Sequence, residues 1–477
     1  MKRCLTLFLA IVLLLSLLPA GTVSIVANAA SSEEDFTYEV HNDQVTITGC
    51  VSEYFSYIDI PQFIDGYPVV RIGKSAFQDY NYLLELTIPE GVEVIEPYAF
   101  YQCQNLRYMT LPNSLVTIGK EAFCGCRYLE ELDFGTSLKT IGEGAFSYCN
   151  ALPFYLDLPD GLETVGMGAF SHCASLETVF LPPSLKDLGA KAFYLCTKLS
   201  YIVIPETVEH IGEKVLYGTA YYKNSYFWYG DALYVGLLLM DAKTTISGSY
   251  TTLKGAVHIA DGAFTNCDNL KEVVLWDGVE VIGSGAFKDC SNLTSVSMPD
   301  SLRSIGSSAF ENCQKLNSIP LPSGVTDIGD RAFYGCKAAT VLQFPDSVVN
   351  LGQDVFTNTG YYNNAENWEN NALCLGNYLI KCKSSISGVY EVPQGIATIA
   401  NGAMKGLSRM TGGGGCGSTH SGKTSRVTRA SCWAKSRYSS SRWSRATSSA
   451  PSSSCRVVTS TLSFSALRSL RSAVRLA

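Results

Sequence analysis

The chain has 477 residues and a net charge of −7, with 36 Lys and Arg against 43 Asp and Glu. The charge is uneven: residues 408–477 carry 12 of the basic residues and none of the acidic ones, which leaves −19 on residues 1–407. A region this acidic repels nucleic acid, which argues against nucleic acid as its ligand.

Residues 1–29 have the pattern of a secretory signal peptide. Lys2 and Arg3 form a positive start, an apolar run extends from Leu5 to Leu18, and Ala27-Asn28-Ala29 offers small residues for cleavage. An uncleaved anchor is the alternative, although the apolar run is short for a bilayer-spanning helix. No later segment is long and apolar enough to span a membrane. We therefore expect a secreted or cell-surface protein with no membrane span after cleavage.

Residues 36–73 are expected to form an N-terminal β cap. Alternating patterns at 36–40 and 44–48 predict two strands, joined by a turn at 41–43. A cap of this kind would cover the apolar end of the first coil, which would otherwise be an aggregation edge.

The dominant pattern is the motif Ile-Gly-x-x-Ala-Phe-x-x-Cys. Within each block of regular coils its copies are evenly spaced, except for one spacing that is longer by one residue. Leu216 and Met404 occupy the Phe position in degenerate copies, which gives thirteen units with the period of leucine-rich repeats. The Phe markers are Phe77, Phe100, Phe123, Phe146, Phe170, Phe193, Phe264, Phe287, Phe310, Phe333 and Phe356.

One unit shows how a coil should form. Leu106, Met109 and Leu111 point inward from a short strand that Pro112 ends, since proline has no N–H for the ladder. Apolar residues up to Ile118 then turn the chain, a glycine permits the bend, and Ala-Phe fills the interior. Because one unit cannot bury its own apolar face, the units must stack. The predicted fold is a repeat solenoid: β-rich leucine-rich repeats with coils of about 23 residues and a parallel sheet on one face.

Two longer intervals between markers, Leu216 to Phe264 and Phe356 to Met404, align with each other and share Tyr, Trp and Gly positions. Each is interpreted as an aromatic-rich insert that follows a block of regular coils. The predicted organisation is leucine-rich repeats at 74–217, an insert at 218–263, repeats at 264–357, and a second insert with a degenerate repeat at 358–407.

The tail at 408–477 breaks the pattern. It contains 20 serines, and glycines stand at 413 and 415 where the repeat requires apolar residues. We expect a disordered Ser/Arg-rich segment, because it has too little patterned apolar surface to fold. A genuine basic linker and an out-of-frame translation of further repeats are both open, and the second is preferred.

The Ile-Gly-x-x-Ala-Phe-x-x-Cys word and the Leu-Pro strand end resemble those of the BspA-like family of bacterial surface leucine-rich repeat proteins. The resemblance covers residues 36 to about 410. It implies a secreted or surface-exposed role in binding or adhesion. It offers no catalytic residues to carry over.

Nine cysteines occupy one position per coil, three positions after the marker. A ladder of buried free thiols is favoured, because free cysteine packs well as a small apolar residue and stacked neighbours would compete for disulfide partners. Scattered disulfides and a metal site are the alternatives. The ladder positions are Cys103, Cys126, Cys149, Cys173, Cys196, Cys267, Cys290, Cys313 and Cys336.

We find no constellation that predicts catalysis, a cofactor or a metal. The five histidines form no metal-binding word, and the acidic residues are scattered at the repeat spacing. Residues 417–424 satisfy the phosphate-loop pattern, but no strand precedes them and no helical stripe follows them. The chain is therefore predicted not to be an enzyme.

The predicted binding surface is the exposed face of the strands, facing an extracellular protein or glycan. Aromatic and acidic residues on one regular face could engage cationic or sugar ligands. An ordinary half-solvated sheet would also display such residues. A scaffold that spaces other modules is the alternative function, and a polymer-degrading hydrolase is a remote one. The candidate residues on the strand face are Glu85, Tyr108, Glu131, Asp133, Tyr155, Asp157, Phe180 and Tyr201.

The first insert supplies two further candidates, Phe227 and Tyr229. Trp228 and Trp368 are common to both inserts and are expected to pack inward, whereas residues that differ between the inserts are freer to carry function. We therefore predict an exposed aromatic patch of Phe227 and Tyr229 on the first insert alone. The alternative is that these two rings cover a local apolar surface.

Overall fold

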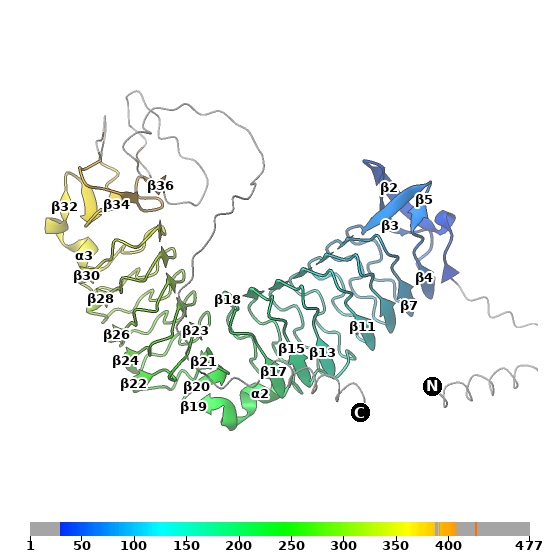
Figure 1. The fold of residues 1–477 in the computed structure, drawn as a ribbon, viewed down its shortest axis with the longest axis horizontal. Coiled ribbons are helices and arrows are strands. Elements are labelled where there is room, and N and C mark those ends of the chain that lie inside the picture. Colours follow the sequence, from blue (N-terminus) through cyan, green and yellow to red (C-terminus); the bar gives the residue numbers. More distant parts are fainter. Residues whose placement is uncertain (1–28, 387–389, 391, 406, 408–424, 427–477) are drawn as a thin grey trace, which may run out of the picture. The chain divides into compact units, whose positions relative to one another are not determined.

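The computed structural model describes residues 29–386, 390, 392–405, 407 and 425–426 (Figure 1). It is a solenoid of stacked coils joined by parallel β-ladders, which confirms the predicted fold class. The expectations for the signal peptide at 1–29 and the phosphate-loop pattern at 417–424 lie outside the described residues, apart from Ala29. The expectations for the tail at 408–477 also lie outside the described residues, apart from residues 425–426.

The chain enters the solenoid through a hairpin. Strand β2 pairs antiparallel with β3 around a turn in which Asn42 and Asp43 adopt positive φ, and β3 continues parallel to β6. Whether this hairpin acts as a cap remains a prediction. The elements of this segment are β1 (Ala29–Ala30), η1 (Glu33–Asp35), β2 (Phe36–His41), β3 (Gln44–Cys50), β5 (Phe63–Ile64) and β6 (Tyr67–Ile72).

Each regular coil of the first block contributes two short strands to two parallel ladders. The first ladder is the one predicted from the sequence. The second runs where only a turn was expected, for example at Ile118. The first ladder is divided into two sheets: one contains β4 (Tyr57–Asp59), β7 (Glu85–Thr87), β9 (Tyr108–Thr110) and β11 (Glu131–Asp133), and the other contains β13 (Tyr155–Asp157), β15 (Thr178–Phe180) and β17 (Tyr201–Val203). The second contains β8 (Val94–Ile95), β10 (Thr117–Ile118), β12 (Thr140–Ile141), β14 (Thr164–Val165), β16 (Asp187–Leu188) and β18 (His210–Ile211).

The second block repeats this arrangement. Its first ladder is also divided into two sheets: one contains β22 (Gly248–Thr251), β24 (Leu270–Val274) and β26 (Ser295–Ser297), and the other contains β28 (Ser318–Pro320) and β30 (Val341–Gln343). Its second contains β23 (His258–Ile259), β25 (Val281–Ile282), β27 (Ser304–Ile305), β29 (Asp327–Ile328) and β31 (Asn350–Leu351).

The repeated word acquires a physical meaning inside the coils. The marker phenylalanines are buried and stack face to face, with centroids 5.0 Å apart between Phe77 and Phe100 and 5.1 Å apart between Phe100 and Phe123. Gly119 is needed for close approach rather than for an unusual φ, because a Cβ there would lie 2.6 Å from the Pro97 nitrogen of the preceding coil. The spacing between coils thus depends on a glycine and a phenylalanine in each unit.

Each insert is a short helix followed by an antiparallel hairpin that joins the second ladder. In the first insert the strand at Ala232–Val235 is buried throughout, and Leu233 and Tyr234 belong to different core clusters. A strand covered on both faces is expected to be continuously apolar, as this one is. This strand of the insert therefore packs against the cores of both blocks.

The first insert contains α2 (Ala220–Lys223), η2 (Ser225–Phe227), β19 (Trp228–Tyr229), β20 (Ala232–Val235) and β21 (Leu238–Ala242). The second contains α3 (Gly360–Asn363), η3 (Ala365–Asn367), β32 (Trp368–Glu369), β33 (Ala372–Leu375) and β34 (Tyr378–Cys382). Strands β35 (Thr398–Ile399) and β36 (Ser425–Arg426) follow.

Candidate ligand-binding face

The parallel register of the first ladder aligns equivalent residues of successive coils. Tyr57, Glu85, Tyr108 and Glu131 are Cα partners in one row, and all four side chains are exposed. Neighbouring strands of a sheet lie about 4.8 Å apart, so tyrosines and glutamates alternate closely along this row. Three of the four were predicted from the sequence. Tyr57 was not, because it precedes the first regular repeat.

The next three coils form a separate sheet in which aromatic rings meet. The Phe180 ring centroid lies 5.5 Å from that of Tyr155 and 5.8 Å from that of Tyr201. Tyr201 is exposed, whereas Tyr155 and Phe180 are half-buried. Asp157 is the Cα partner of Phe180 and is also half-buried, and Asp133 is exposed on the preceding sheet. Four of the eight strand-face candidates therefore lie on each of these two sheets, and not all are equally accessible.

The second block presents a different face at the same positions. Its first two rows of Cα partners are Ser249, Glu272 and Ser295, and Thr251, Val274 and Ser297. Neither row contains an aromatic residue, and one acidic residue, Glu272, is present. The aromatic character of these rows is thus a property of the first block rather than of the fold.

The prediction for the first insert was wrong for Phe227. This side chain is half-buried, and its ring stacks on Tyr221 with a centroid distance of 3.7 Å and an interplanar angle of 8°. The short helix α2 presents Tyr221 to that ring. The exposed aromatics here are Tyr226 and Tyr229, with 85% and 57% of their surface accessible.

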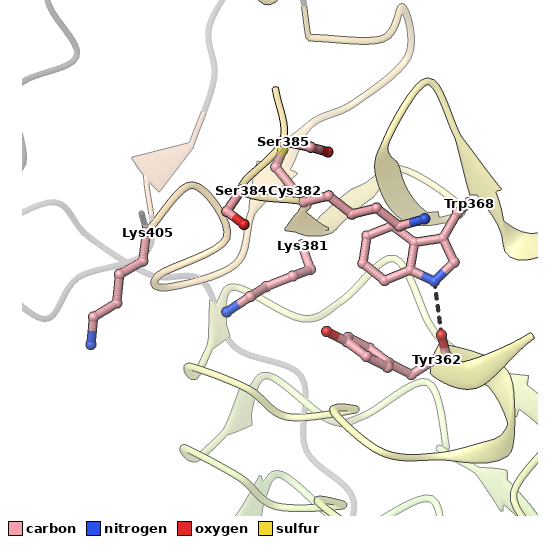
Figure 2. Close-up of a pocket in the computed structure, with 8 residues that line it drawn as sticks. Tyr362, Trp368, Lys381, Cys382, Ser384, Ser385 and Lys405 are labelled. Carbon is pink, nitrogen blue, oxygen red and sulfur yellow. Dashed lines mark hydrogen bonds between the residues drawn. The ribbon is translucent and has the colours of Figure 1, made fainter. Parts of the chain in front are cut away.

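The two insert tryptophans make equivalent contacts but are half-buried rather than fully inward. The Nε1 atom of Trp228 donates to the Tyr222 carbonyl at 2.7 Å, and that of Trp368 donates to the Tyr362 carbonyl at 2.8 Å. In both pairs the tyrosine and tryptophan rings meet edge-on, with centroids 5.2 Å apart. Each frame lines a pocket, with a volume of about 420 Å³ in the first insert and about 430 Å³ in the second (Figure 2).

The pockets also contain lysines that sequence reasoning did not single out. Lys243 lies over the Trp228 ring at 5.1 Å, and Lys383 lies over the Trp368 ring at 4.8 Å. Lys381 and Lys405 line the second pocket as well. The alignment of the two inserts could have drawn attention to Lys243 and Lys383, which occupy equivalent positions. No local pattern connects Lys381 with Lys405.

The ladder cysteines are structural. The described cysteines are free, and the nine ladder thiols are buried. Cys103 Sγ donates to the Phe77 carbonyl of the preceding coil at 3.0 Å, and Cys336 Sγ donates to the Phe310 carbonyl at 3.1 Å. Burial raises the pKa of Cys336 to about 12, so this thiol stays protonated. Such thiols are poor nucleophiles and poor metal ligands.

A charged contact joins the first block to the coil that follows its insert. His210 Nδ1 lies 2.7 Å from Asp187, and its Nε2 lies 2.8 Å from Asp261. Hydrogen bonds to Asp187 and Asp261 raise the pKa of His210 to about 10. The imidazolium therefore ties the two carboxylates together.

The described residues include no group of three or more His, Cys, Asp or Glu side chains placed to hold a metal ion. Nor does any helix in that part of the chain have the length and apolar character needed to cross a bilayer.

The BspA type leucine rich repeat model matches residues 51–156, 154–230 and 257–387 in six copies. A leucine-rich repeat protein from Bacteroides ovatus is 29% identical, covering 68% of this chain and 91% of its own, with a TM-score of 0.34. A leucine rich cell surface protein from Faecalibacterium prausnitzii is 29% identical, covering 69% and 92%, with a TM-score of 0.40. The pneumococcal vaccine antigen PcpA is 19% identical, covering 78% and 93%, with a TM-score of 0.29. No curated protein matches the chain.

Proposed function

Because the chain belongs to the BspA-type leucine-rich repeat family, we propose that it is a secreted or surface-exposed protein that binds an extracellular protein or glycan. The signal-peptide pattern at residues 1–29 supports export. The ligand-binding surface is the strand face of the first block.

The observation that carries this proposal is the row Tyr57, Glu85, Tyr108 and Glu131. Tyrosine supplies a large, rigid contact area with a polar end, and glutamate supplies charge for a cationic partner. A coil needs neither residue at this position to fold, because Ser295, Ser318 and Val341 occupy it in three coils of the second block. The side chains of this row are therefore available for recognition.

The test is a binding screen of the full chain against arrays of extracellular proteins and glycans. A Tyr108→Ser, Glu131→Ser, Tyr201→Ser variant gives the first block the polar character of the second. We expect it to lose about tenfold or more in affinity for any ligand found, because exposed aromatics concentrate binding energy. Its stability should change little, since all three side chains are exposed.

The matched control changes the second block instead, with Ser249→Ala and Ser295→Ala. It should bind like the parent chain. Retention of full affinity by the first-block variant would remove the strand face as the site, and absence of any ligand would favour a scaffold that spaces other modules.

A further inference from the structure

The second insert contains a positively charged pocket in an otherwise acidic body. All three lysines within residues 358–407, namely Lys381, Lys383 and Lys405, line it. Lys383 and Lys405 are exposed, and neither forms an ion pair with any residue that the structure describes. Figure 2 shows the Trp368 and Tyr362 rings on one side of the pocket and Lys405 on the other.

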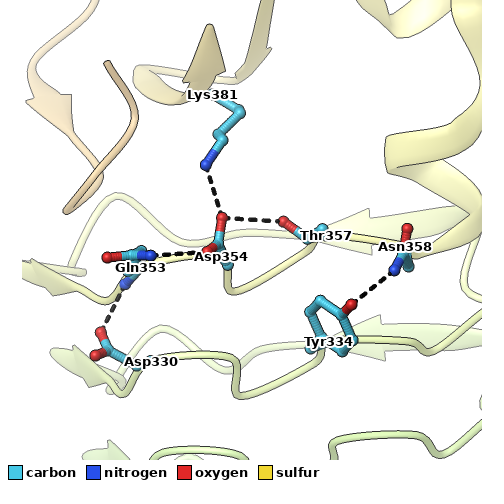
Figure 3. A network of polar contacts seen from close by, with 7 residues as sticks. All are labelled: Asp330, Tyr334, Gln353, Asp354, Thr357, Asn358 and Lys381. Atoms are coloured by element: carbon cyan, nitrogen blue, oxygen red, sulfur yellow. Dashed lines mark hydrogen bonds and ion pairs between the residues drawn. The ribbon is translucent and has the colours of Figure 1, made fainter. Parts of the chain in front are cut away.

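Lys381 is held in place by an ion pair with the last regular coil. Its Nζ lies 2.7 Å from Asp354 Oδ1, and Gln353 Nε2 donates to the other carboxylate oxygen at 2.9 Å (Figure 3). Burial alone would raise the pKa of Asp354, but the hydrogen bonds from Lys381 and Gln353 outweigh it and lower that pKa. Asp354 thus offsets the charge of Lys381 and leaves Lys383 and Lys405 as the cations available to a ligand.

The equivalent pocket of the first insert has the same aromatic frame and a different charge. Asp241 stands at the position of Lys381, and Thr265 at that of Lys405. Lys243, the counterpart of Lys383, pairs with Asp231 at 3.1 Å, whereas Asn371 replaces that aspartate in the second insert. The first pocket is therefore lined by two lysines, Lys223 and the ion-paired Lys243, whereas the second is lined by three, of which Lys381 is ion-paired.

We propose that the pocket of the second insert binds a carboxylate-bearing sugar, such as a uronic acid unit of a polysaccharide. Lys383 and Lys405 contact the carboxylate, and the rings of Trp368 and Tyr362 pack against the apolar face of the sugar. The hydroxyls of Ser384 and Ser385, which also line the pocket, can bond to sugar hydroxyls. This site is separate from the strand face of the first block.

Three features favour this ligand over other anions. The volume of about 430 Å³ lies in the range of small-ligand sites. Aromatic rings beside cations suit a ligand with both an apolar face and a charge. The net charge of −19 on residues 1–407 repels densely charged polyanions, whereas a uronic acid carries a single charge per ring.

The experiment titrates the full chain with trigalacturonate and with neutral galactotriose by calorimetry. We expect saturable binding of trigalacturonate that weakens with salt, and no binding of the neutral sugar. A Lys383→Gln, Lys405→Gln variant should lose roughly tenfold in affinity, the loss expected for two exposed ion pairs. Both lysines are exposed, so circular dichroism should show an unchanged fold.

The matched control is Lys223→Gln with Lys243→Gln in the first pocket, which should leave trigalacturonate affinity unchanged. Triglutamate serves as a competitor with the same charge and no sugar ring. Equal binding of triglutamate, no saturable binding of trigalacturonate, or an undiminished affinity in the Lys383→Gln, Lys405→Gln variant would each overturn the proposal. The strand-face variant should retain trigalacturonate binding, which keeps this test independent of the function proposed above.

Discussion

The two copies of the larger unit, each a block of coils followed by an insert, share their packing and differ in their charges. Both have the phenylalanine stack and the tryptophan–tyrosine frame. Where the copies differ, charged residues change in pairs. Asp241 of the first insert interacts electrostatically with Lys214. In the second copy Lys381 takes the position of Asp241 and Asp354 that of Lys214, so the acid and the base are exchanged. The exchange keeps the attraction between the two positions while it reverses the sign of each.

A second difference follows the same rule. Asp187, His210 and Asp261 of the first copy correspond to Asp327, Asn350 and Asn401 of the second. The second copy has lost one acid and the imidazole together, and Asn350 Nδ2 still donates to Asp327. Packing therefore sets the repeat, and charge is the property that varies between copies without disturbing it.

The first prediction tests whether packing is equivalent in the two copies. Phe170→Ala and Phe310→Ala should each lower the free energy of unfolding by about 3–5 kcal/mol, the usual cost of removing a buried phenylalanine. Both rings are fully buried between two stacked neighbours. Urea unfolding followed by circular dichroism measures the loss.

The control for this prediction is Phe154→Ala. The Phe154 side chain is 59% exposed and lies outside the stack, so its removal should change stability by less than about 0.5 kcal/mol. A loss at Phe310 much smaller than that at Phe170 would show that the two blocks are not energetically equivalent.

The parts of this molecule that could be predicted are those that repeat. The period determined which residues point inward, since Leu106, Met109 and Leu111 are all buried. The pocket could not be predicted, because Lys381 and Lys405 are well separated in the sequence and meet only through the hairpin. Phe227 was misjudged for a related reason: its exposure depends on how helix α2 presents Tyr221, which no residue pattern specifies.

The second prediction concerns the charged contact found only in the first copy. Replacing His210 with asparagine, the residue of the second copy, should cost about 1–2 kcal/mol near neutral pH. The raised pKa alone would correspond to a larger loss of stability, but the His210 side chain is 48% exposed and solvent screens the interaction. Thermal or urea unfolding of both proteins across pH provides the measurement.

The sign of the pH dependence follows from the direction of the shift. The pKa of His210 is raised from 6.5 to about 10 in the folded chain. The stability it contributes is therefore complete below about pH 6.5 and is lost as the pH rises through 10. The two proteins should differ most at about pH 6.5 and converge by about pH 10.5. A difference that grows with pH would contradict the charged contact. The buried His258 is present in both proteins and largely cancels in the comparison.

The smallest effect is expected where the two inserts differ at the surface. Tyr226→Glu and Tyr229→Glu introduce the residues of the second insert and should together change stability by less than about 0.5 kcal/mol, because both tyrosines are exposed. Phe227→Ala should cost about 1–2 kcal/mol in the same assay, since it removes the ring stacked on Tyr221.

Phe227→Asn separates packing from hydrogen bonding at this position. In the second insert the equivalent Asn367 donates from Nδ2 to the Tyr361 carbonyl at 2.8 Å. An asparagine at position 227 can donate to the Tyr221 carbonyl in the same way, so it should recover part of the stability that alanine loses. If the asparagine and alanine variants are equally unstable, the two inserts do not share a backbone frame at this turn. If Tyr226→Glu and Tyr229→Glu are as costly as Phe227→Ala, these tyrosines are structural and leave the first insert without a free aromatic surface.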